Sequence, residues 1–366
     1  MRAVPSGLAA LAALLLAATA LARGTIFAPA DNTNVRDMPE YVADGDFNDD
    51  GDRDVAVANR GDDNVSILLG DGAGNLTLDD DYAVGDEPEG IVDGRFNGDK
   101  NTDLAVVNKE GDNVSILLGR GDGTFRDARN IAVGDEPRGL VAGEFNGDGK
   151  RDLAVSNFAS DNLTILLART KGRFRHSADV KAGDGPRGVD TEDINKDGRA
   201  DLAVVDDNAS KVAVFLGRGN GKFRSRGKFS VGSMPFAITL ADYNNDKKFD
   251  AAVQNSGDND VSVRLGRGDG TFRNEHTFDV GANPFHLTSG DFNVDGNKDL
   301  GVANADDDNV SILLGDGDGG FAAADDYDVG DFPIGMTVVN LDRADGPDIT
   351  VANANDDNVS VLLNEP

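Results

Sequence analysis

Short apolar runs separated by segments rich in Asp, Asn and Gly fill the chain from residue 25 onward. In one representative stretch the apolar runs occupy residues 140–143, 153–156, 163–167 and 174–182. These runs are rich in Val, Ile and Leu and are bounded by Gly, Asp, Asn or Pro, which is the pattern of β-strands. No segment shows a 3.6-residue apolar period long enough for a helix. The pattern therefore predicts an all-β protein.

The same unit returns every 49 residues without insertion or deletion. A proline column marks the period at Pro39, Pro88, Pro137, Pro186, Pro235, Pro284 and Pro333. An apolar column keeps the same register at Phe27, Leu76, Phe125, Phe174, Phe223, Phe272 and Phe321. Four short strands in a unit of this length are typical of a propeller blade. Seven such units fit between residue 24 and the C-terminus, which predicts a seven-bladed β-propeller with four-stranded blades.

The two ends of the chain predict how the ring closes. The last repeat stops after the run 359–363 and lacks its fourth strand. Residues 25–28 align with the apolar column and are expected to supply that strand to the final blade. Closure of this kind leaves no exposed strand edge between the first and last repeats.

Each repeat also carries an acidic nine-residue loop between its first and second strands. The loop 46–54 has oxygen-bearing side chains at positions 1, 3, 5 and 9 and Gly51 at position 6. Ca²⁺ takes six to eight oxygen ligands at about 2.3–2.6 Å, and a glycine reaches the positive φ of a sharp bend at little cost. The loop therefore predicts a calcium site.

The seven loops differ in their ligand sets. Three are complete and keep the glycine: Asp46, Asn48, Asp50 and Asp54; Asp193, Asn195, Asp197 and Asp201; Asp291, Asn293, Asp295 and Asp299. Two are complete but altered: Glu144, Asn146, Asp148 and Asp152 begin with a longer side chain, and Asp242, Asn244, Asp246 and Asp250 surround Lys247 at the glycine position. Two are degenerate: one has Arg95 and Lys100 beside Asn97, Asp99 and Asp103, and the other has Asn340, Asp342, Ala344 and Asp348.

We expect three loops to bind Ca²⁺ well, two to bind it weakly and two to stay empty, which gives three to five calcium ions. In the alternative interpretation, Asp and Asn only stabilise tight turns by accepting hydrogen bonds from backbone N–H groups.

The repeat resembles the FG-GAP or VCBS repeat of integrin-alpha-type seven-bladed propellers. The resemblance is clearest in the loop that begins at Asp291 and in the run Asn309 to Gly315, and it covers the chain after residue 22. It implies calcium in the loop between the first and second strands and a role in extracellular or cell-surface recognition. It implies no single activity.

The N-terminus and the composition point to an exported protein. Residues 1–22 resemble a secretory signal, with Arg2 before an Ala/Leu-rich run and Ala20-Leu21-Ala22 as a cleavage site; an uncleaved anchor is the alternative. Residues 23–366 then form the secreted or cell-surface propeller, with no membrane span, and we expect a monomer. A net charge of −31, with 57 Asp, disfavours nucleic acid and anionic membranes as partners. The chain has no Cys, so no disulfide stabilises it.

The residue after each column proline varies while the rest of the repeat is nearly constant. This column reads Glu40, Glu89, Arg138, Arg187, Phe236, Phe285 and Ile334. It lies at the opposite end of the first strand from the acidic loop, where the strands approach the central channel. An acidic, a basic and an apolar arc on a constant scaffold predict a ligand site, because function is added to folds through such positions. Packing between blades is the alternative.

Two functions fit these features. The first is a non-catalytic, calcium-stabilised recognition, adhesion or scaffold protein that binds an extracellular protein or glycan. The second is a polysaccharide-active hydrolase or lyase that uses Glu40 and Glu89 with an Arg138–Arg187 clamp. Without Trp, and with only four Tyr, the chain has few flat rings for sugars, although Phe236 and Phe285 remain candidates. His176, His276 and His286 fall in different repeat columns or blades and predict no catalytic site.

Overall fold

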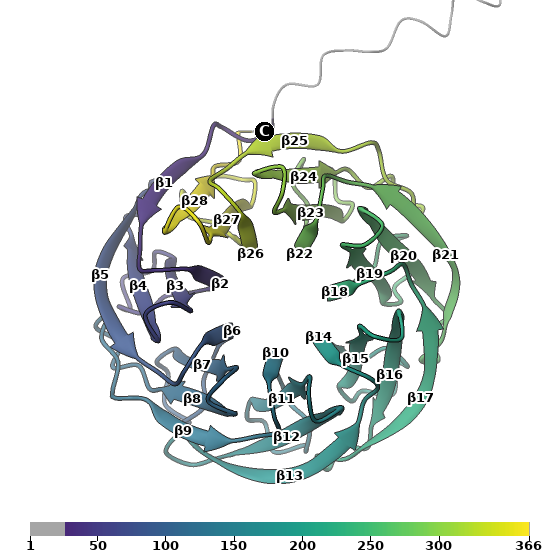
Figure 1. Ribbon diagram of the computed structural model, residues 1–366, viewed down its shortest axis with the longest axis horizontal. Helices are drawn as coiled ribbons and strands as arrows, with labels where there is room; N and C mark the ends of the chain where they lie inside the picture. The colour runs from purple at the N-terminus through teal and green to yellow at the C-terminus, as the bar shows by residue number, and fades with distance from the viewer. Residues whose placement is uncertain (1–25, 366) are drawn as a thin grey trace, which may run out of the picture.

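A computed structural model describes residues 26–365 as seven four-stranded antiparallel sheets arranged in a ring (Figure 1). Blade 1 contains β2 (Pro39–Gly45), β3 (Asp54–Asn59), β4 (Asn64–Gly70) and β5 (Leu76–Ala83). Blade 2 contains β6 (Pro88–Gly94), β7 (Asp103–Asn108), β8 (Asn113–Leu117) and β9 (Arg129–Ala132). Blade 3 contains β10 (Pro137–Gly143), β11 (Asp152–Asn157), β12 (Asn162–Arg169) and β13 (Arg173–Lys181). The seven-bladed propeller expected from the repeats is confirmed.

The second half of the ring continues in the same order. Blade 4 contains β14 (Pro186–Glu192), β15 (Asp201–Asp206), β16 (Lys211–Gly217) and β17 (Phe223–Ser230). Blade 5 contains β18 (Pro235–Ala241), β19 (Asp250–Asn255), β20 (Asp260–Gly266) and β21 (Phe272–Asp279). Blade 6 contains β22 (Pro284–Gly290), β23 (Asp299–Asn304), β24 (Asn309–Leu313) and β25 (Asp325–Asp328). Blade 7 joins β26 (Pro333–Val339), β27 (Asp348–Asn353) and β28 (Asn358–Leu362) to β1 (Asp31–Asn34) from the N-terminal side.

Ring closure by the N-terminal strand is confirmed, but the strand lies later in the chain than residues 25–28. Residues 31–34 pair with β28, whereas Phe27 makes only an isolated bridge to Asn364. Pro29 lies between these two contacts and has no N–H group to donate to a ladder. Residue 25, like the predicted signal segment 1–22, lies outside the described residues.

The hydrophobic core lies between adjacent blades. Ala56 and Ile67 of blade 1, for example, pack in one buried cluster with Leu104 and Val106 of blade 2. The second strand of every blade is buried along its whole length. Neighbouring blades therefore depend on one another for burial of their apolar side chains. Residues 26–365 contain no helix long and apolar enough to cross a membrane.

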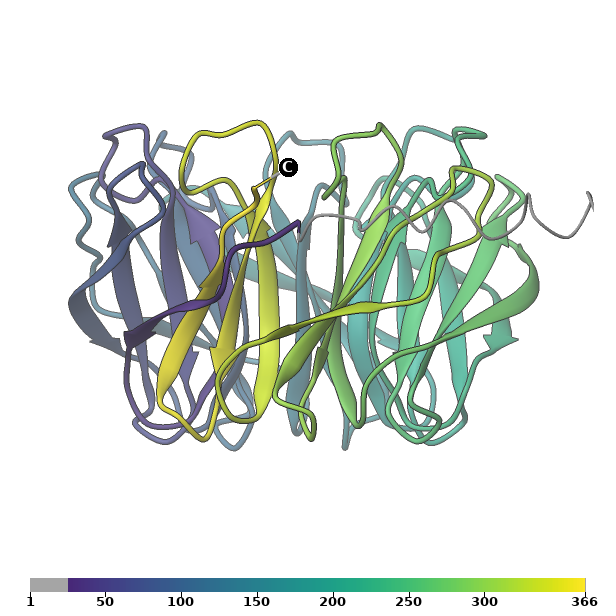
Figure 2. The same cartoon turned by 90° about the horizontal axis from the view of Figure 1, so that it is seen from above.

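Each first strand runs along the channel from one rim of the ring to the other (Figures 1 and 2). The column prolines begin these strands at one rim, which we call the channel mouth, and the acidic loops follow them at the other, which we call the loop rim. Loops gather at both rims (Figure 2). The two candidate sites therefore lie at opposite ends of the channel.

Candidate functional site

The seven acidic loops of the loop rim fall into two groups by backbone conformation. Position 4 has a positive φ in all seven loops: Asp49, Gly98, Gly147, Lys196, Asn245, Val294 and Arg343. Position 6 has a positive φ in five of them: Gly51, Gly149, Gly198, Lys247 and Gly296. Lys100 and Asp345, at position 6 of the two degenerate loops, do not. The five loops with complete ligand sets therefore share one backbone shape.

Oxygen atoms in these five loops accept backbone hydrogen bonds. Asp291 Oδ2 accepts from Gly296 N at 2.9 Å, and Asp295 N donates to Asp291 Oδ1 at 3.0 Å. The longer Glu144 folds back over its loop, because its Oε1 accepts from the N–H groups of Asn146, Gly147 and Asp148. These bonds match the turn-stabilising alternative, yet they leave oxygen lone pairs free. Asp46 Oδ1 is buried without any hydrogen-bond partner.

The donor set and the loop backbone fit a hard cation such as Ca²⁺. Among residues 26–365, however, no three Asp, Glu or His side chains meet around one point in this conformation. Calcium binding therefore requires the loop carboxylates to turn inward from their backbone partners.

The aspartate at position 9 has a structural role in all seven blades. Asp54 Oδ2 accepts from Phe47 N at 2.7 Å, and its Oδ1 accepts from Gly70 N at 3.0 Å. The degenerate second loop keeps the same bonds, from Phe96 N and Gly119 N to Asp103. Burial raises the pKa of Asp54 and of Asp103 to about 6. An aspartate at this position alone is therefore no sign of a metal.

The channel mouth is shaped by β-bulges. The register between the first and second strands shifts directly after the column proline in every blade, as it does between Pro39 and Tyr41 and between Pro137 and Gly139. The residue before each of these prolines has a positive φ: Met38, Glu87, Glu136, Gly185, Met234, Asn283 and Phe332. Bulges re-aim side chains at barrel rims and active sites. The variable column lies within these bulges.

The two glutamates of the mouth are buried and paired with arginines. Glu40 is only 6% exposed, and its Oε1 accepts from Arg60 Nη1 at 3.2 Å. Burial and the nearby Glu89 raise the pKa of Glu40 to about 7. Glu89 Oε1 lies 3.4 Å from Arg138 Nη1, and burial raises the pKa of Glu89 as well. Glu89 Oε2 and Arg138 Nε are both buried without a hydrogen-bond partner.

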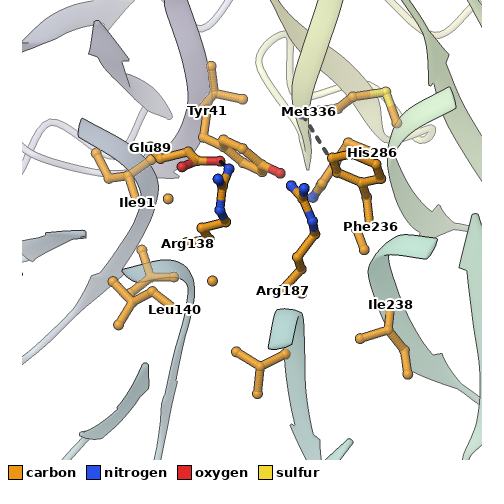
Figure 3. A pocket seen from close by; sticks show the side chains of 17 residues that line it. Tyr41, Glu89, Ile91, Arg138, Leu140, Arg187, Phe236, Ile238, His286 and Met336 are labelled. Carbon is orange, nitrogen blue, oxygen red and sulfur yellow. Dashed lines mark hydrogen bonds and ion pairs between the residues drawn. The ribbon is translucent and has the colours of Figure 1, made fainter. Parts of the chain in front are cut away.

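The two arginines of the mouth lie over aromatic rings. The guanidinium carbons of Arg138 and Arg187 lie 4.7 and 4.9 Å from the centre of the Phe158 ring. Arg187 Nε donates to Asp207 at 2.5 Å. Figure 3 shows both arginine side chains extending toward Tyr41. Stacking on a ring fixes the plane of a guanidinium group and leaves its edge able to bind a carboxylate, sulfate or phosphate.

The apolar arc completes the mouth. The ring centres of Phe236 and Phe285 lie 4.9 Å apart, and those of Phe285 and Phe332 lie 5.7 Å apart. These rings, the arginines and the glutamates line a cavity of about 310 Å³. The structure therefore brings together all six residues predicted to bind ligand: Glu40, Glu89, Arg138, Arg187, Phe236 and Phe285.

A second cavity of about 240 Å³ lies next to the first. The two share Tyr41, Glu89, Arg138, Arg187 and Phe236 as lining residues. The second cavity also contains His286, whose ring meets that of Tyr41 edge-on at 5.2 Å and whose Nδ1 accepts from Met336 N at 3.4 Å (Figure 3). Burial lowers the pKa of His286 to about 4, so this imidazole is neutral at pH 7.

Comparison with known families decides the classification. The profile of the FG-GAP-like repeat matches residues 95–155, 144–204, 193–253 and 242–302, and each match begins at the first residue of an acidic loop. The chain belongs to the FG-GAP-like repeat family. The matches advance by the same 49 residues as the blades, so the FG-GAP-like repeat and the blade have the same period. None of the curated proteins matches the chain in sequence at a significant level.

Solved structures share the fold of this FG-GAP propeller at low identity. BBS1N, from a complex with ARL6DN, is 13% identical, with a TM-score of 0.67 over 93% of this chain and 98% of that chain. Virginiamycin B lyase from Staphylococcus aureus is 13% identical, with a TM-score of 0.61 over 92% and 99% of the two chains. The periplasmic gluconolactonase PpgL of Pseudomonas aeruginosa is 17% identical, with a TM-score of 0.61 over 80% and 86%. These similarities concern the fold alone, because the sequence identities are only 13–17%.

Several side chains of the mouth lie outside the variable column and were not predicted. Arg60 and Phe158 follow the second strands of blades 1 and 3, and Phe332 precedes the proline of blade 7. The sequence does contain a signal for Phe158, because the residue type at this position varies between repeats. The equivalent residues of blades 2 and 4 are Lys109 and Asp207. Variation in this second column marks it as another part of the FG-GAP propeller's mouth.

Proposed function

We propose that this FG-GAP propeller is an exported, calcium-binding recognition or adhesion protein without catalytic activity, which binds an extracellular protein or glycan at its channel mouth. The observation that supports this most is the position of Arg138 and Arg187 beside the cavity of about 310 Å³. Both guanidinium groups are fixed by the Phe158 ring, so little conformational entropy is lost when they bind.

The unpartnered atoms favour a polar ligand. Glu89 Oε2 is a buried acceptor and Arg138 Nε a buried donor, and neither has a partner. Buried polar groups are nearly always hydrogen-bonded to protein or water, so at this pair water or a polar ligand can add the missing bonds. The Phe236 and Phe285 rings on the other side of the cavity offer apolar contact to the same ligand.

The carboxylates of the mouth favour binding over catalysis. Glu40 and Glu89 each form an ion pair with an arginine, at 3.2 and 3.4 Å. A carboxylate in this position orients the arginine and balances its charge. Glu40 then orients Arg60, and Glu89 orients Arg138.

Calcium has a stabilising role in this proposal. The carboxylates at positions 1, 5 and 9 of a complete loop repel one another, and a bound cation removes that repulsion. Melting the protein with and without a chelator tests this role. A higher midpoint with calcium supports it, and an unchanged midpoint contradicts it.

Ligand arrays test the recognition role. Glycan and protein arrays are probed with the parent protein, with the Arg138→Ala/Arg187→Ala variant, and with Arg267→Ala/Arg273→Ala as a control that removes two arginines from the outer wall. Ligands that require the mouth should be retained by the control and lost by the first variant. Ligands bound equally by all three proteins would exclude the mouth as the site.

The alternative is a polysaccharide hydrolase or lyase. One observation favours it: the pKa of Glu40 is raised to about 7, and a carboxyl group of this kind suits a general acid. Incubation with a panel of polysaccharides, followed by an assay for new reducing ends or unsaturated products, distinguishes the two functions. Turnover that is lost in Glu40→Gln would establish the enzyme and exclude the purely binding role.

A further inference from the structure

A cavity of about 410 Å³ lies on the outer wall of the ring, between blades 2 and 3 and away from the channel. Five cationic side chains line it: Arg120, Arg126, Arg129, Lys171 and Arg173. Its apolar lining comes from Ile116 and Leu118, and Asp127 is the one carboxylate among its lining residues. We call this feature the wall cavity.

The wall cavity forms where the outer strand of blade 2 is interrupted. After a single bridge between Phe125 and Gly119 the chain leaves the sheet, and β9 begins only at Arg129. Blade 3 closes the other side through the hairpin between β12 and β13. Arg129 Nη1 donates to Gly172 O of this hairpin at 3.4 Å, and Lys171 N donates to Asn97 O at 3.3 Å.

The positive charges of the wall cavity exceed the negative charge of its lining. Within residues 26–365, none of the five cationic side chains lies within ion-pair distance of a carboxylate, although the chain has a net charge of −31. Like charges gathered around one space repel one another, and a bound anion relieves that repulsion. The lining is therefore suited to an anionic group.

Blade 6 shows that the fold does not require these charges. Its outer strand has the same interruption, with a bridge between Gly315 and Phe321 before β25 begins. The positions equivalent to Arg120, Arg126 and Arg129 are occupied there by Asp316, Ala322 and Asp325. The same strand interruption thus carries basic residues in blade 2 and acidic or small residues in blade 6, so the interruption itself does not require the basic residues.

The positive surface continues beyond the cavity. Next to Arg173, which lines the cavity, Arg175 on β13 and Arg224 on β17 are exposed on the wall of blades 3 and 4. The outer strands of blades 1 and 6 instead carry acidic runs, at residues 79–81 and 325–326. The outer wall therefore carries basic residues on β13 and β17 and acidic residues on β5 and β25, strands that lie on different sides of the ring in Figure 1.

The geometry points to a binding site for an acidic polysaccharide at the wall cavity. Arginine binds carboxylate and sulfate through paired hydrogen bonds. An acidic polysaccharide repeats its charged groups along its length, and the exposed arginines likewise repeat along the wall of blades 3 and 4. A single-stranded nucleic acid is disfavoured because its bases need aromatic platforms and no aromatic side chain is among the lining residues. The nearby Phe174 instead packs beside Phe96, with ring centres 5.7 Å apart.

Calorimetric titration with dextran sulfate, polygalacturonate and uncharged dextran tests this assignment. The site variant is Arg120→Asp/Arg126→Ala, which copies two residues of blade 6. The control is Arg267→Asp/Arg273→Ala, which makes the same change of charge at the equivalent positions of blade 5, where β21 runs unbroken from Phe272. Arg120 and Arg267 make the same turn contact, to Phe125 O and Phe272 O respectively. The Arg→Asp changes in the two variants therefore remove the same turn contact.

We expect a charged polymer to bind the parent and the control, and the site variant to bind it at least about tenfold more weakly, because hydrogen bonds to charged groups are lost. Four results would overturn the assignment: no binding of either charged polymer, equal binding of uncharged dextran, equal weakening in the control, or an oligothymidylate bound as tightly as the polysaccharide. Loss of binding in Arg138→Ala/Arg187→Ala instead would place the polymer at the channel mouth and would also overturn it.

Discussion

The guanidinium carbon of Arg187 lies 3.9 Å from the centre of the Phe236 ring, which joins the basic arc of the channel mouth to its apolar arc. Phe158 lies against the same arginine and against Arg138, so it positions both guanidinium groups.

Replacement of the Phe158 ring should destabilise the folded protein. We expect Phe158→Ala to lower the free energy of unfolding by about 1–2 kcal/mol, since two cation–π contacts are lost. Phe158→Tyr keeps the aromatic face and should stay within about 0.5 kcal/mol of the parent. Urea denaturation of the three proteins measures both values. Equal losses in the two variants would show that the aromatic face contributes nothing.

Glu40 should make stability depend on pH. Its pKa rises from an ordinary value near 4.5 to about 7 in the folded protein. The folded state therefore holds this proton more tightly than the unfolded chain, so the carboxyl group favours folding at low pH and loses that contribution as the pH rises through 7. The loss amounts to about 2 kcal/mol between pH 5 and pH 8.

The variant Glu40→Gln cannot titrate at this position, and Arg60 still has Glu87 as a partner at 3.0 Å. Unfolding free energies of parent and variant at the two pH values isolate the contribution of Glu40. We expect the variant to lose less stability than the parent. A parallel pH dependence in the two proteins would show that Glu40 titrates normally.

Ring closure should depend on Phe27. This buried ring packs edge-on against Phe292 and Tyr327, with centres 5.6 and 5.3 Å away. Phe125 has the same position within blade 2, with Phe47 and Tyr82 both 5.4 Å away. Both Phe27→Ala and Phe125→Ala should lower stability by about 3–5 kcal/mol.

Only the first change should release the N-terminal strand, because residues 31–34 are joined to blade 7 by pairing with β28 and not by a hairpin. Limited proteolysis should therefore cut the Phe27→Ala variant first within residues 26–36. The Phe125→Ala variant should be cut first elsewhere. Identical cleavage patterns would contradict this role of the N-terminal strand.

The repeat period predicted most of the fold, because seven equal units with four strands each have few ways to bury their apolar faces. The prolines mark the true beginnings of the first strands. The closing segment extends further than predicted: Phe27 forms a bridge to Asn364, and the regular strand follows at residues 31–34, beyond Pro29.

The sequence also predicted which side chains gather at the mouth, because they vary on a constant scaffold. It did not predict their partners. Arg60 lies 20 residues after Glu40, and Asp207 lies 20 residues after Arg187. These pairs form only when the chain has folded back along the second strand. The wall cavity was not predicted either, because an interrupted outer strand has no clear signature in the repeat.

Lys247 should weaken the fifth loop through its backbone. It has a φ of 61°, a conformation that is unfavourable for a residue with a Cβ, whereas Gly296 in the sixth loop has a φ of 89°. We expect Lys247→Gly to raise stability and Gly296→Lys to lower it, each by about 1–2 kcal/mol. Thermal unfolding without calcium measures both changes. Stability changes of the same sign in the two variants would show that the backbone conformation at position 6 does not cause them.

Calorimetric titration of the chelator-treated protein with calcium tests the central claim most directly. The five loops with positive φ at both position 4 and position 6 should bind five ions, more tightly in the loops that begin at Asp46, Asp193 and Asp291 than in those that begin at Glu144 and Asp242. Asp46→Ala should remove one tight site, and Asp342→Ala, in a degenerate loop, should remove none. Absence of binding, or seven equal sites, would contradict the assignment.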